Sequence, residues 1–495
     1  MRMPEPDARA LAKKDEIVSR LREIVPGEGV IATDPELRAY ECDGLSAYHA
    51  VPMAVVLPED TRQVAQVLRL CNDERIKVVP RGAGTSLSGG ALPLTDGIVL
   101  GLGKFNRILE IDYENRCVVA QPGVTNLGIT NAVQDQGFYY APDPSSQIAC
   151  SIGGNVAENS GGVHCLKYGL TTNNLLGLEM VLPNGDVIRL GGKHMDAGGY
   201  DLLGLMTGSE GLLGVVTEVT VRILRKPETA RALLIGFPTS EQGGDAVAAI
   251  IANGIIPGGL EMMDGPAIRA AEEFVHAGYP LDAEALLICE LDGPEGEVSH
   301  LIEVVSAIVR QHGATTVRVS RDDEERQRFW AGRKAAFPAV GRISPDYYCM
   351  DGTIPRKQLP HVLGRMQEMS ERYGLKVANV FHAGDGNLHP LVLYDGSNEG
   401  EAEKAHDLAG DIVIACLDAG GSLTGEHGIG EDKKKHMPKM FTQEDMDTMQ
   451  LLRCAFDPHH VANPGKIFPT PRLCGERPGP FKMHPIQKAG LAEQF

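Results

Sequence analysis

The sequence predicts an α+β protein, with a glycine-rich first half followed by a half in which strands and helices alternate. Of its 495 residues, 43% are hydrophobic and only 5% aromatic, a composition that suits a glycine-rich protein of mixed helices and strands better than an all-β one. Glycine-rich loops separate short apolar runs up to Lys226 and Pro227, where the pattern changes. Two βαβ-type passages beyond that point predict an antiparallel sheet with helices on one face.

Short apolar runs define the elements of the first half in order. Apolar residues at helical spacing predict a helix over 7–25, and Asp60 precedes a second helical pattern that reaches Cys71. A further helix is expected over 124–136, because Gly137 follows it as a typical helix end. Apolar runs of strand length occur at 55–57, 76–79, 98–100, 117–120, 176–182, 187–190 and 215–224.

The second half begins a new pattern near residue 227. Apolar spacing predicts an amphipathic helix over 298–309, which Gly313 closes, and a similar strand and helix unit recurs around 347–419. From residue 470 the chain is rich in proline and polar residues, and we expect a loosely ordered tail. Strands are expected at 233–237, 259–263, 285–291 and 315–319.

Charge and composition exclude several classes of function. The formal net charge of −19 argues against nucleic acid as a partner. No apolar run is long enough for a transmembrane segment, and the charged N-terminus has no apolar signal core, so we expect no export. The ten cysteines form no C-x-x-C pair, which disfavours a zinc-thiolate site or an iron–sulfur cluster in this chain.

A glycine-rich loop over 80–90 directly follows the strand at 76–79 and predicts an anion-binding cradle, because glycine lets backbone N–H groups approach a ligand closely. The loop has no lysine, as a P-loop requires, and Leu87 stands where a Rossmann fingerprint needs its third glycine. A second glycine-rich region spans 141–162. Two such regions suit an extended dinucleotide, and the alternative is that both are ordinary mobile loops.

The second half carries a cluster that suits a metal ion. His382 and His389 flank a Gly-Asp-Gly turn in an H-x-G-D-G-N-x-H segment, and Glu426 lies in a G-E-H-G segment. Two histidines and one carboxylate suit a divalent metal with open positions for substrate or water. The alternative is two hydrogen-bonded turn histidines and an exposed glutamate.

Three further side chains are candidates for acid–base chemistry and substrate binding. His427 is our candidate base, because histidine has a pKa near neutral pH, and the alternative is a supporting hydrogen-bond role. Arg333, which follows Trp330 at helical spacing, and Arg342 are candidates for binding a substrate carboxylate. Lys433 and the two lysines after it are expected on a solvated face.

Together, residues 80–90, 142–162 and 207–211 resemble the FAD-binding domain of the vanillyl-alcohol oxidase and p-cresol methylhydroxylase superfamily. Within it, the H-x-G-D-G-N-x-H and G-E-H-G-I-G segments resemble the family of FAD-linked glycolate oxidase subunits and D-lactate and D-2-hydroxyglutarate dehydrogenases. In that family the same segments form a metal and active-site assembly, and Arg333 matches the substrate-binding arginine. The resemblance implies that FAD is held by Pro80, Arg81, Gly82, Ala83, Gly84, Thr85, Ser86, Ser88, Gly89, Pro142, Asp143, Pro144, Ser146, Gly153, Gly154, Asn155, Asn159, Ser160, Gly161, Gly162, Glu210, Gly211, Val216 and Asn463.

The resemblance also implies an architecture: a two-subdomain FAD-binding domain of the vanillyl-alcohol oxidase type, an α+β substrate (cap) domain with an antiparallel sheet, and a C-terminal helical segment. We expect an N-terminal helical segment over 1–47, the FAD-binding domain over 48–227 and the cap domain over 228–420. The segment 421–470 is expected to return to the flavin, and 471–495 to form the tail.

The expected activity is FAD-dependent oxidation of a small D-2-hydroxy acid, glycolate or D-lactate, with a zinc-like divalent metal and a non-nicotinamide electron acceptor. The alternatives are a D-2-hydroxyglutarate dehydrogenase and a non-catalytic FAD-binding electron-transfer subunit. Pro390 and Leu391, where dicarboxylate enzymes of the family tend to have a polar residue, favour a monocarboxylic acid. The resemblance further implies FAD-binding and iron–sulfur partner subunits, and a cytoplasmic location at the inner face of the membrane through them.

Overall fold

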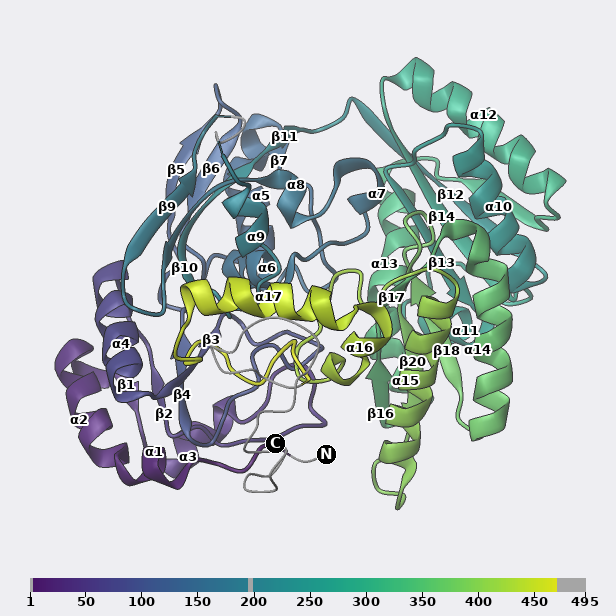
Figure 1. Cartoon of the computed structure of the whole chain (residues 1–495). Coiled ribbons are helices and arrows are strands. Elements are labelled where there is room, and N and C mark those ends of the chain that lie inside the picture. Colours follow the sequence, from purple (N-terminus) through teal and green to yellow (C-terminus); the bar gives the residue numbers. More distant parts are fainter. Residues whose placement is uncertain (1–2, 195–198, 470–495) are drawn as a thin grey trace.

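The computed structural model describes residues 3–194 and 199–469, so the expected tail over 471–495 lies outside the described residues. Three larger sheets of four, five and seven strands form the framework of this part of the chain. Figure 1 shows the two smaller of these sheets on one side of the molecule and the seven-stranded sheet on the other. The molecule is thus an α+β protein, as the sequence predicts.

The first sheet has the order β1-β2-β4-β3, in which β2, β4 and β3 run parallel. The predicted helix over 7–25 forms as two helices that meet at Lys13. Asp60 caps the next helix by accepting a hydrogen bond from the backbone N–H of Gln63. The elements are α1 (Ala8–Ala12), α2 (Lys14–Ile24), β1 (Val30–Ile31), α3 (Asp34–Leu37), β2 (Ala54–Val56), α4 (Thr61–Glu74), β3 (Lys77–Arg81) and β4 (Gly97–Gly101).

The second sheet is antiparallel, in the order β5-β6-β10-β8-β9. Short helices join its strands and carry the second glycine-rich region. Its strands are β5 (Ile108–Asp112), β6 (Cys117–Ala120), β8 (Leu175–Val181), β9 (Val187–Gly191) and β10 (Val215–Arg222), and a separate pair is formed by β7 (Phe138–Tyr139) and β11 (Leu224–Arg225). The helices are α5 (Asn126–Val133), α6 (Ile152–Glu158), α7 (Cys165–Tyr168), α8 (Thr171–Asn174) and α9 (Leu202–Met206).

The third sheet is antiparallel throughout, in the order β15-β12-β14-β13-β18-β20-β16. Its strands are β12 (Thr229–Phe237), β13 (Gly259–Asp264), β14 (Ala285–Gly293), β15 (Thr316–Val319), β16 (Asp346–Cys349), β18 (Val377–Phe381) and β20 (Pro390–Tyr394), and the short pair β17 (Gly352–Thr353) and β19 (Asn387–Leu388) lies apart from it. The helices of this half are α10 (Ser240–Ala252), α11 (Gly265–Val275), α12 (Glu295–Gln311), α13 (Asp323–Val340), α14 (Leu359–Tyr373) and α15 (Glu401–Asp418).

Helices cover both faces of this third sheet, so the expectation of helices on one face only is wrong. Side chains alternate along β12: Leu233 and Ile235 pack in one core with α10, α12, α14 and α15, whereas Ala232 and Leu234 pack in another with α11 and α13. Both faces of the central strands are therefore apolar, as expected for strands buried on two sides. The second face matters for function, because α13 carries Arg333.

The C-terminal segment returns to the first sheet. It contains α16 (Met437–Met440) and α17 (Gln443–Phe456), and α17 crosses the middle of the view in Figure 1. Beyond α17, the backbone N–H of Val78 in β3 donates to Val461, and Asn463 donates to the carbonyl of Val78. The last described residues therefore lie beside the strand from which the glycine-rich loop starts.

Candidate active site

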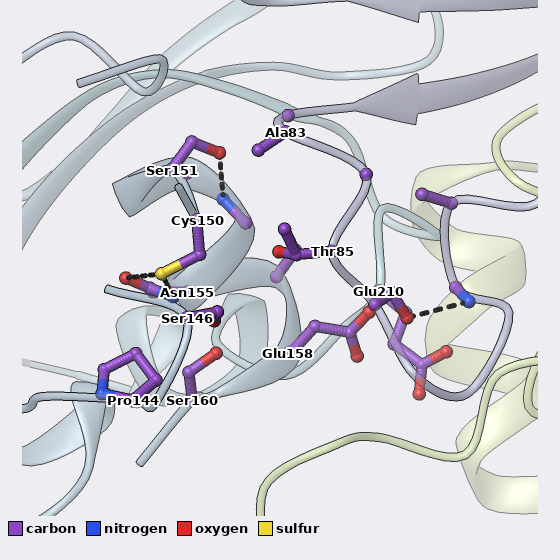
Figure 2. Close-up of a pocket in the computed structure, with 18 of the residues that line it drawn as sticks. Ala83, Thr85, Pro144, Ser146, Cys150, Ser151, Asn155, Glu158, Ser160 and Glu210 are labelled. Atoms are coloured by element: carbon purple, nitrogen blue, oxygen red, sulfur yellow. Dashed lines mark hydrogen bonds between the residues drawn. The ribbon is translucent and has the colours of Figure 1, made fainter. Parts of the chain in front are cut away.

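A cavity of about 480 Å³ lies where the glycine-rich loops of the first half meet the second half of the chain. Figure 2 shows Ala83 and Thr85 on one side of it, Ser146 and Ser151 on the other, and Glu158 near one end. The cavity extends to His389, Glu426 and His427. Its volume is typical of a site for a small molecule or cofactor.

Glycine is needed in the loop after β3 for two reasons. Gly84 has a φ of +74°, a left-handed conformation that other residues adopt only with strain. Gly82 packs so closely on Ser151 that a Cβ atom there would clash with the Ser151 hydroxyl. The glycines therefore bring the loop against the start of α6, and the two glycine-rich regions become opposite walls of one cavity.

The structure brings most of the residues expected to hold FAD to this cavity. Those that line it are Pro80, Arg81, Gly82, Ala83, Gly84, Thr85, Ser86, Pro144, Ser146, Gly153, Gly154, Asn155, Ser160, Glu210, Gly211 and Val216. Those that do not line it are Ser88, Gly89, Pro142, Asp143, Asn159, Gly161, Gly162 and Asn463.

Several of the residues outside the lining hold the cavity's walls together. Asn463 donates from Nδ2 to the carbonyls of Gly90, at 2.8 Å, and Glu210, at 2.6 Å. Ser88 donates from Oγ to the carbonyl of His427 at 2.7 Å. The backbone N–H of Gly161 lies 3.1 Å from Glu426 Oε2. The FAD-side loops are thus bonded directly to the segment that carries the candidate chemistry.

His382, His389 and Glu426 converge at the far end of the cavity. Glu426 Oε1 lies 3.3 Å from His382 Nε2 and 3.1 Å from His389 Nε2. Both histidines are buried, and His389 Nε2 makes no well-directed hydrogen bond to any residue that the structure describes. Two imidazole nitrogens and a carboxylate oxygen within 4.8 Å of one another are a donor set that fits a divalent metal.

A buried glutamate, Glu261 on β13, supports this cluster from behind. Its Oε1 accepts from His382 Nδ1 at 2.7 Å, which leaves His382 Nε2 facing Glu426. Its Oε2 pairs with Arg333, at 2.8 Å from Nε and 2.7 Å from Nη2. A carboxylate on the far nitrogen of a metal-binding histidine is a common way to fix its ring. Arg333 itself is 1% exposed and does not line the cavity.

A second group of potential ligands, Asp351, His389 and His427, is also close enough to hold an ion. The Asp351 carboxylate is already used, however, because it accepts the backbone N–H groups of Gly425, Glu426 and His427 at 2.7–2.9 Å. It also forms a buried ion pair with Lys433. Asp351 therefore organises the loop, and the group with His382 and Glu426 is the better metal site. The expectation that Lys433 lies on a solvated face is wrong.

His427 lines the cavity next to this cluster. Its ring stacks on that of His389, with centroids 4.8 Å apart and planes 1° from parallel. Burial lowers the pKa of His427 to about 4, despite the opposing effect of the nearby Asp351 carboxylate. His427 is thus neutral at neutral pH, the state in which an imidazole nitrogen can accept a proton.

Arg342 lies away from this cluster, at the surface beyond the end of α13. Its guanidinium is about half exposed, 3.5 Å from the Glu273 carboxylate and over the ring of Phe274. It does not line the cavity.

Sequence reasoning missed several residues that the structure places at the site. Glu261 and Asp351 could have been found as the acidic residues of otherwise apolar stretches, a pattern that indicates a buried, paired carboxylate. Lys334 and Phe337 line the cavity beside His389 but follow no recognisable motif. Glu158 also lines the cavity, and burial together with the nearby Glu210 carboxylate raises the pKa of its carboxyl group well above the usual value.

Comparison with known proteins agrees with this geometry. Residues 52–191 match the family described as "FAD binding domain", and residues 226–467 match "FAD linked oxidases, C-terminal domain". The glycolate oxidase subunit GlcD of Escherichia coli is 57% identical over 93% of this chain and 92% of its own length. GlcD of Bacillus subtilis is 40% identical over 87% and 92% of the two chains. A D-lactate dehydrogenase of Anaerostipes hadrus is 33% identical over 91% and 97%.

Solved structures with low sequence identity share the fold. The 4-ethylphenol oxidase of Gulosibacter chungangensis superposes with a TM-score of 0.78 at 18% identity, over 94% of this chain and 99% of that one. A p-cresol methylhydroxylase superposes with a TM-score of 0.77 at 16% identity, over 92% and 97%. The expected fold of the vanillyl-alcohol oxidase type is therefore confirmed.

Proposed function

The chain belongs to the FAD-linked oxidase family that includes the glycolate oxidase subunits GlcD, and we propose that it oxidises a small D-2-hydroxy acid to the 2-oxo acid. It is an FAD-linked oxidoreductase, as its two family matches and its 57% identity to a GlcD protein indicate. Glycolate and D-lactate are the proposed substrates, because the relatives are named for them. The observation that carries the proposal is that His389, Glu426 and His427 line the same cavity as the glycine-rich loops.

The residues around the cavity fit FAD and, at one end, a metal. The glycine-rich walls offer backbone N–H groups without side chains in the way, which suits a pyrophosphate. When FAD is bound there, it supplies the acceptor for the hydride from the carbinol carbon. His382, His389 and Glu426 would hold a divalent metal, which would lower the pKa of the substrate hydroxyl.

His427 is proposed to take the hydroxyl proton. It is neutral, it lines the cavity, and it directly follows Glu426, so base and metal ligand sit at one place. Stacking on His389 fixes the plane of its ring. A positioned base of this kind accelerates such a step by roughly 10²–10⁴-fold.

Arg333 is proposed to attract the substrate carboxylate. Its Nε donates to Glu261 and its Nη2 lies within ion-pair distance of the same oxygen, but neither Nη1 nor Nη2 has a well-directed hydrogen-bond partner among the described residues. Because Arg333 lies behind the cluster and does not line the cavity, it would act on the substrate carboxylate through its positive charge. Because Glu261 also holds His382, the same carboxylate positions both Arg333 and one of the metal ligands.

A merely electron-carrying FAD subunit would not require this set of groups. Reduced flavin must still pass its electrons on, and the E. coli and B. subtilis relatives are named as subunits of an oxidase. We propose that a second FAD-binding subunit and an iron–sulfur subunit take the electrons from this chain. These partners would hold a cytoplasmic protein at the inner face of the membrane, since no helix in the described part of the chain could span one.

Anaerobic flavin bleaching tests the proposal. The FAD-loaded protein is mixed with glycolate, D-lactate or D-2-hydroxyglutarate, and flavin absorbance is followed with time. We expect rapid bleaching by glycolate or D-lactate and slower bleaching by the dicarboxylate. The most effective acid identifies the substrate, and preferential bleaching by D-2-hydroxyglutarate would contradict the assignment to a monocarboxylic acid.

A further inference from the structure

The substrate end of the cavity has one wall made by helix α13. Lys334, Phe337 and Pro338 line the cavity, and their spacing of i, i+3 and i+4 places them on one face of the helix. Arg333, one position earlier, points instead to Glu261. The same helix therefore places one cation, Arg333, behind the cluster and presents one lysine and two apolar side chains to the cavity.

Phe337 is the bulky member of this wall and stands next to the reacting groups. Its ring meets the His389 ring edge to face, with centroids 6.4 Å apart and an angle of 66° between the planes. His389 in turn stacks on His427, the proposed base. A substrate whose hydroxyl lies between the metal ligands and His427 would have Phe337 beside its carbinol carbon.

The Phe337 ring is held in place from behind. Tyr347 also packs edge to face with this ring, at 6.3 Å between centroids, and Phe337 packs against the apolar core that α11 and α13 share with the sheet. Pro338 follows it directly and removes the backbone donor that would have bonded the carbonyl of Lys334. Because two aromatic rings and an apolar core pack against it, the Phe337 ring acts as a fixed wall.

We propose that Phe337 sets the size of the accepted substrate, restricting it to 2-hydroxy acids whose carbinol carbon carries hydrogen or a methyl group. This inference rests on the proposed function and narrows its substrate class. Extra methylene groups would collide with the Phe337 ring. Discrimination by an apolar wall is typically about 10- to 200-fold per methylene group.

Replacing the ring with smaller side chains tests the inference. Phe337→Ala and Phe337→Leu are compared with the parent protein for anaerobic flavin reduction by glycolate, D-lactate, D-2-hydroxybutyrate and D-2-hydroxy-4-methylpentanoate. The ratio of kcat/KM for the longest acid to that for glycolate should rise about tenfold or more in Phe337→Ala, and by a smaller factor in Phe337→Leu. Phe274→Ala is the matched control, because Phe274 is an exposed phenylalanine of α11 that does not line the cavity.

A binding measurement separates a size effect from damage to the chemistry. The 2-oxo acids of the same lengths are titrated into the oxidised, FAD-loaded proteins, and Kd is taken from the change in the flavin spectrum. Phe337→Ala should tighten binding of the longest 2-oxo acid relative to glyoxylate. Phe337→Leu serves the same purpose if the alanine variant fails to retain FAD.

The outcomes distinguish this inference from the function on which it rests. If no 2-hydroxy acid of the panel bleaches the parent flavin, the proposed function itself is contradicted. If glycolate bleaches it but the ratios of kcat/KM and Kd stay unchanged in both Phe337 variants, the role of Phe337 is contradicted. The role of Phe337 would also be contradicted if the parent protein oxidised the longest acid with the same kcat/KM as glycolate.

Discussion

At the scale of single residues, His427 is the group whose removal should separate cofactor binding from chemistry. In His427→Asn, flavin reduction by the substrate acid should slow roughly 10²–10⁴-fold, because the proton acceptor is lost. FAD content, measured from the absorbance of purified protein, should stay unchanged. His361→Asn, on an exposed position of α14, is the matched control. A reduction rate close to that of the parent would contradict the assignment of His427 as the base.

Glu261 should affect the affinity for the metal without being one of its ligands. In Glu261→Gln, His382 loses the carboxylate that holds its ring and Arg333 loses its partner. Loss of such a supporting group typically weakens metal binding about 10- to 100-fold. Elemental analysis and competition with a chelator would measure this. His382→Asn, which removes a ligand, should lose the metal, and Glu284→Gln, at an exposed position directly before β14, is the control. Unchanged metal affinity in Glu261→Gln would contradict its supporting role, and unchanged affinity in His382→Asn would show that His382, His389 and Glu426 are not the metal site.

At the scale of elements, one buried carboxylate organises the loop that carries Glu426 and His427. Asp351 accepts three successive backbone N–H groups from this loop and pairs with buried Lys433. Burial by itself would raise the pKa of Asp351. Lys433, His427, His389 and the backbone donors lower it by more, so the pKa lies far below the usual range. The loop therefore depends on an ionised Asp351.

Breaking this pair should destabilise the protein strongly. Asp351→Asn leaves Lys433 as an unpaired buried charge, and removal of one partner of a buried pair costs about 3–5 kcal/mol. Urea unfolding would measure the loss of unfolding free energy. The double variant Asp351→Asn with Lys433→Met should recover part of it, since no charge is then left unpaired. An additive loss in the double variant would mean that the two groups are not coupled.

Much of the element pattern can be predicted from the sequence, because most strands are short apolar runs bounded by glycine or charge. The strand over 259–263 and the helix over 298–309 are examples that the structure reproduces as β13 and α12. Which faces the helices cover could not be predicted. The strands of the third sheet are apolar on both faces, so the sequence shows no alternation of polar and apolar residues that would mark one face as exposed.

The site is predictable only where it follows a motif. The H-x-G-D-G-N-x-H and G-E-H-G segments alone identify His382, His389, Glu426 and His427 as candidates. Glu261 and Phe337 belong to no motif, because their roles depend on which strand and helix face the cluster. Lys433 illustrates the same limit, since a run of lysines usually lies in solvent and only tertiary contact with Asp351 buries one of them.

At the scale of the whole molecule, a buried charge cluster joins the two halves of the chain. His164, beside α7, lies 2.9 Å from Asp143 and 3.3 Å from Glu290 on β14 of the large sheet. Trp330 and Arg326 of α13 donate to the same Glu290 carboxylate at 2.5 and 3.0 Å. The loop that contributes Pro144 and Ser146 to the cavity is thus fixed to the sheet and helix that carry Glu261 and Arg333.

This cluster should make stability depend on pH in a defined direction. Burial alone would raise the pKa of Glu290, but His164 and Arg326 lower it to about 2, so its stabilising effect is present above about pH 4.3 and is lost as pH falls through about 2. Burial would lower the pKa of His164, but Asp143 and Glu290 raise it well above its usual value. Its effect is present below about pH 6.5 and is lost as pH rises through the raised pKa.

Glu290→Gln should therefore destabilise the protein most between about pH 4.3 and 6.5, where both partners are charged in the folded and unfolded states alike. Breaking a buried pair predicts a loss of about 3–5 kcal/mol there, and the difference from the parent should shrink towards either extreme. Unfolding curves across pH would show this, with Glu295→Gln, at the exposed start of α12, as the control. A difference that does not change with pH would rule out the charge pairing.

The central claim is that this cavity oxidises a small 2-hydroxy acid by hydride transfer to bound FAD. The most direct test is the rate of anaerobic flavin bleaching by glycolate and by glycolate deuterated at the carbinol carbon, measured by rapid mixing. The claim predicts complete bleaching with both and a slower rate with the deuterated acid, because that carbon–hydrogen bond breaks as the flavin is reduced. A flavin that dithionite bleaches but that glycolate and D-lactate leave oxidised would contradict it.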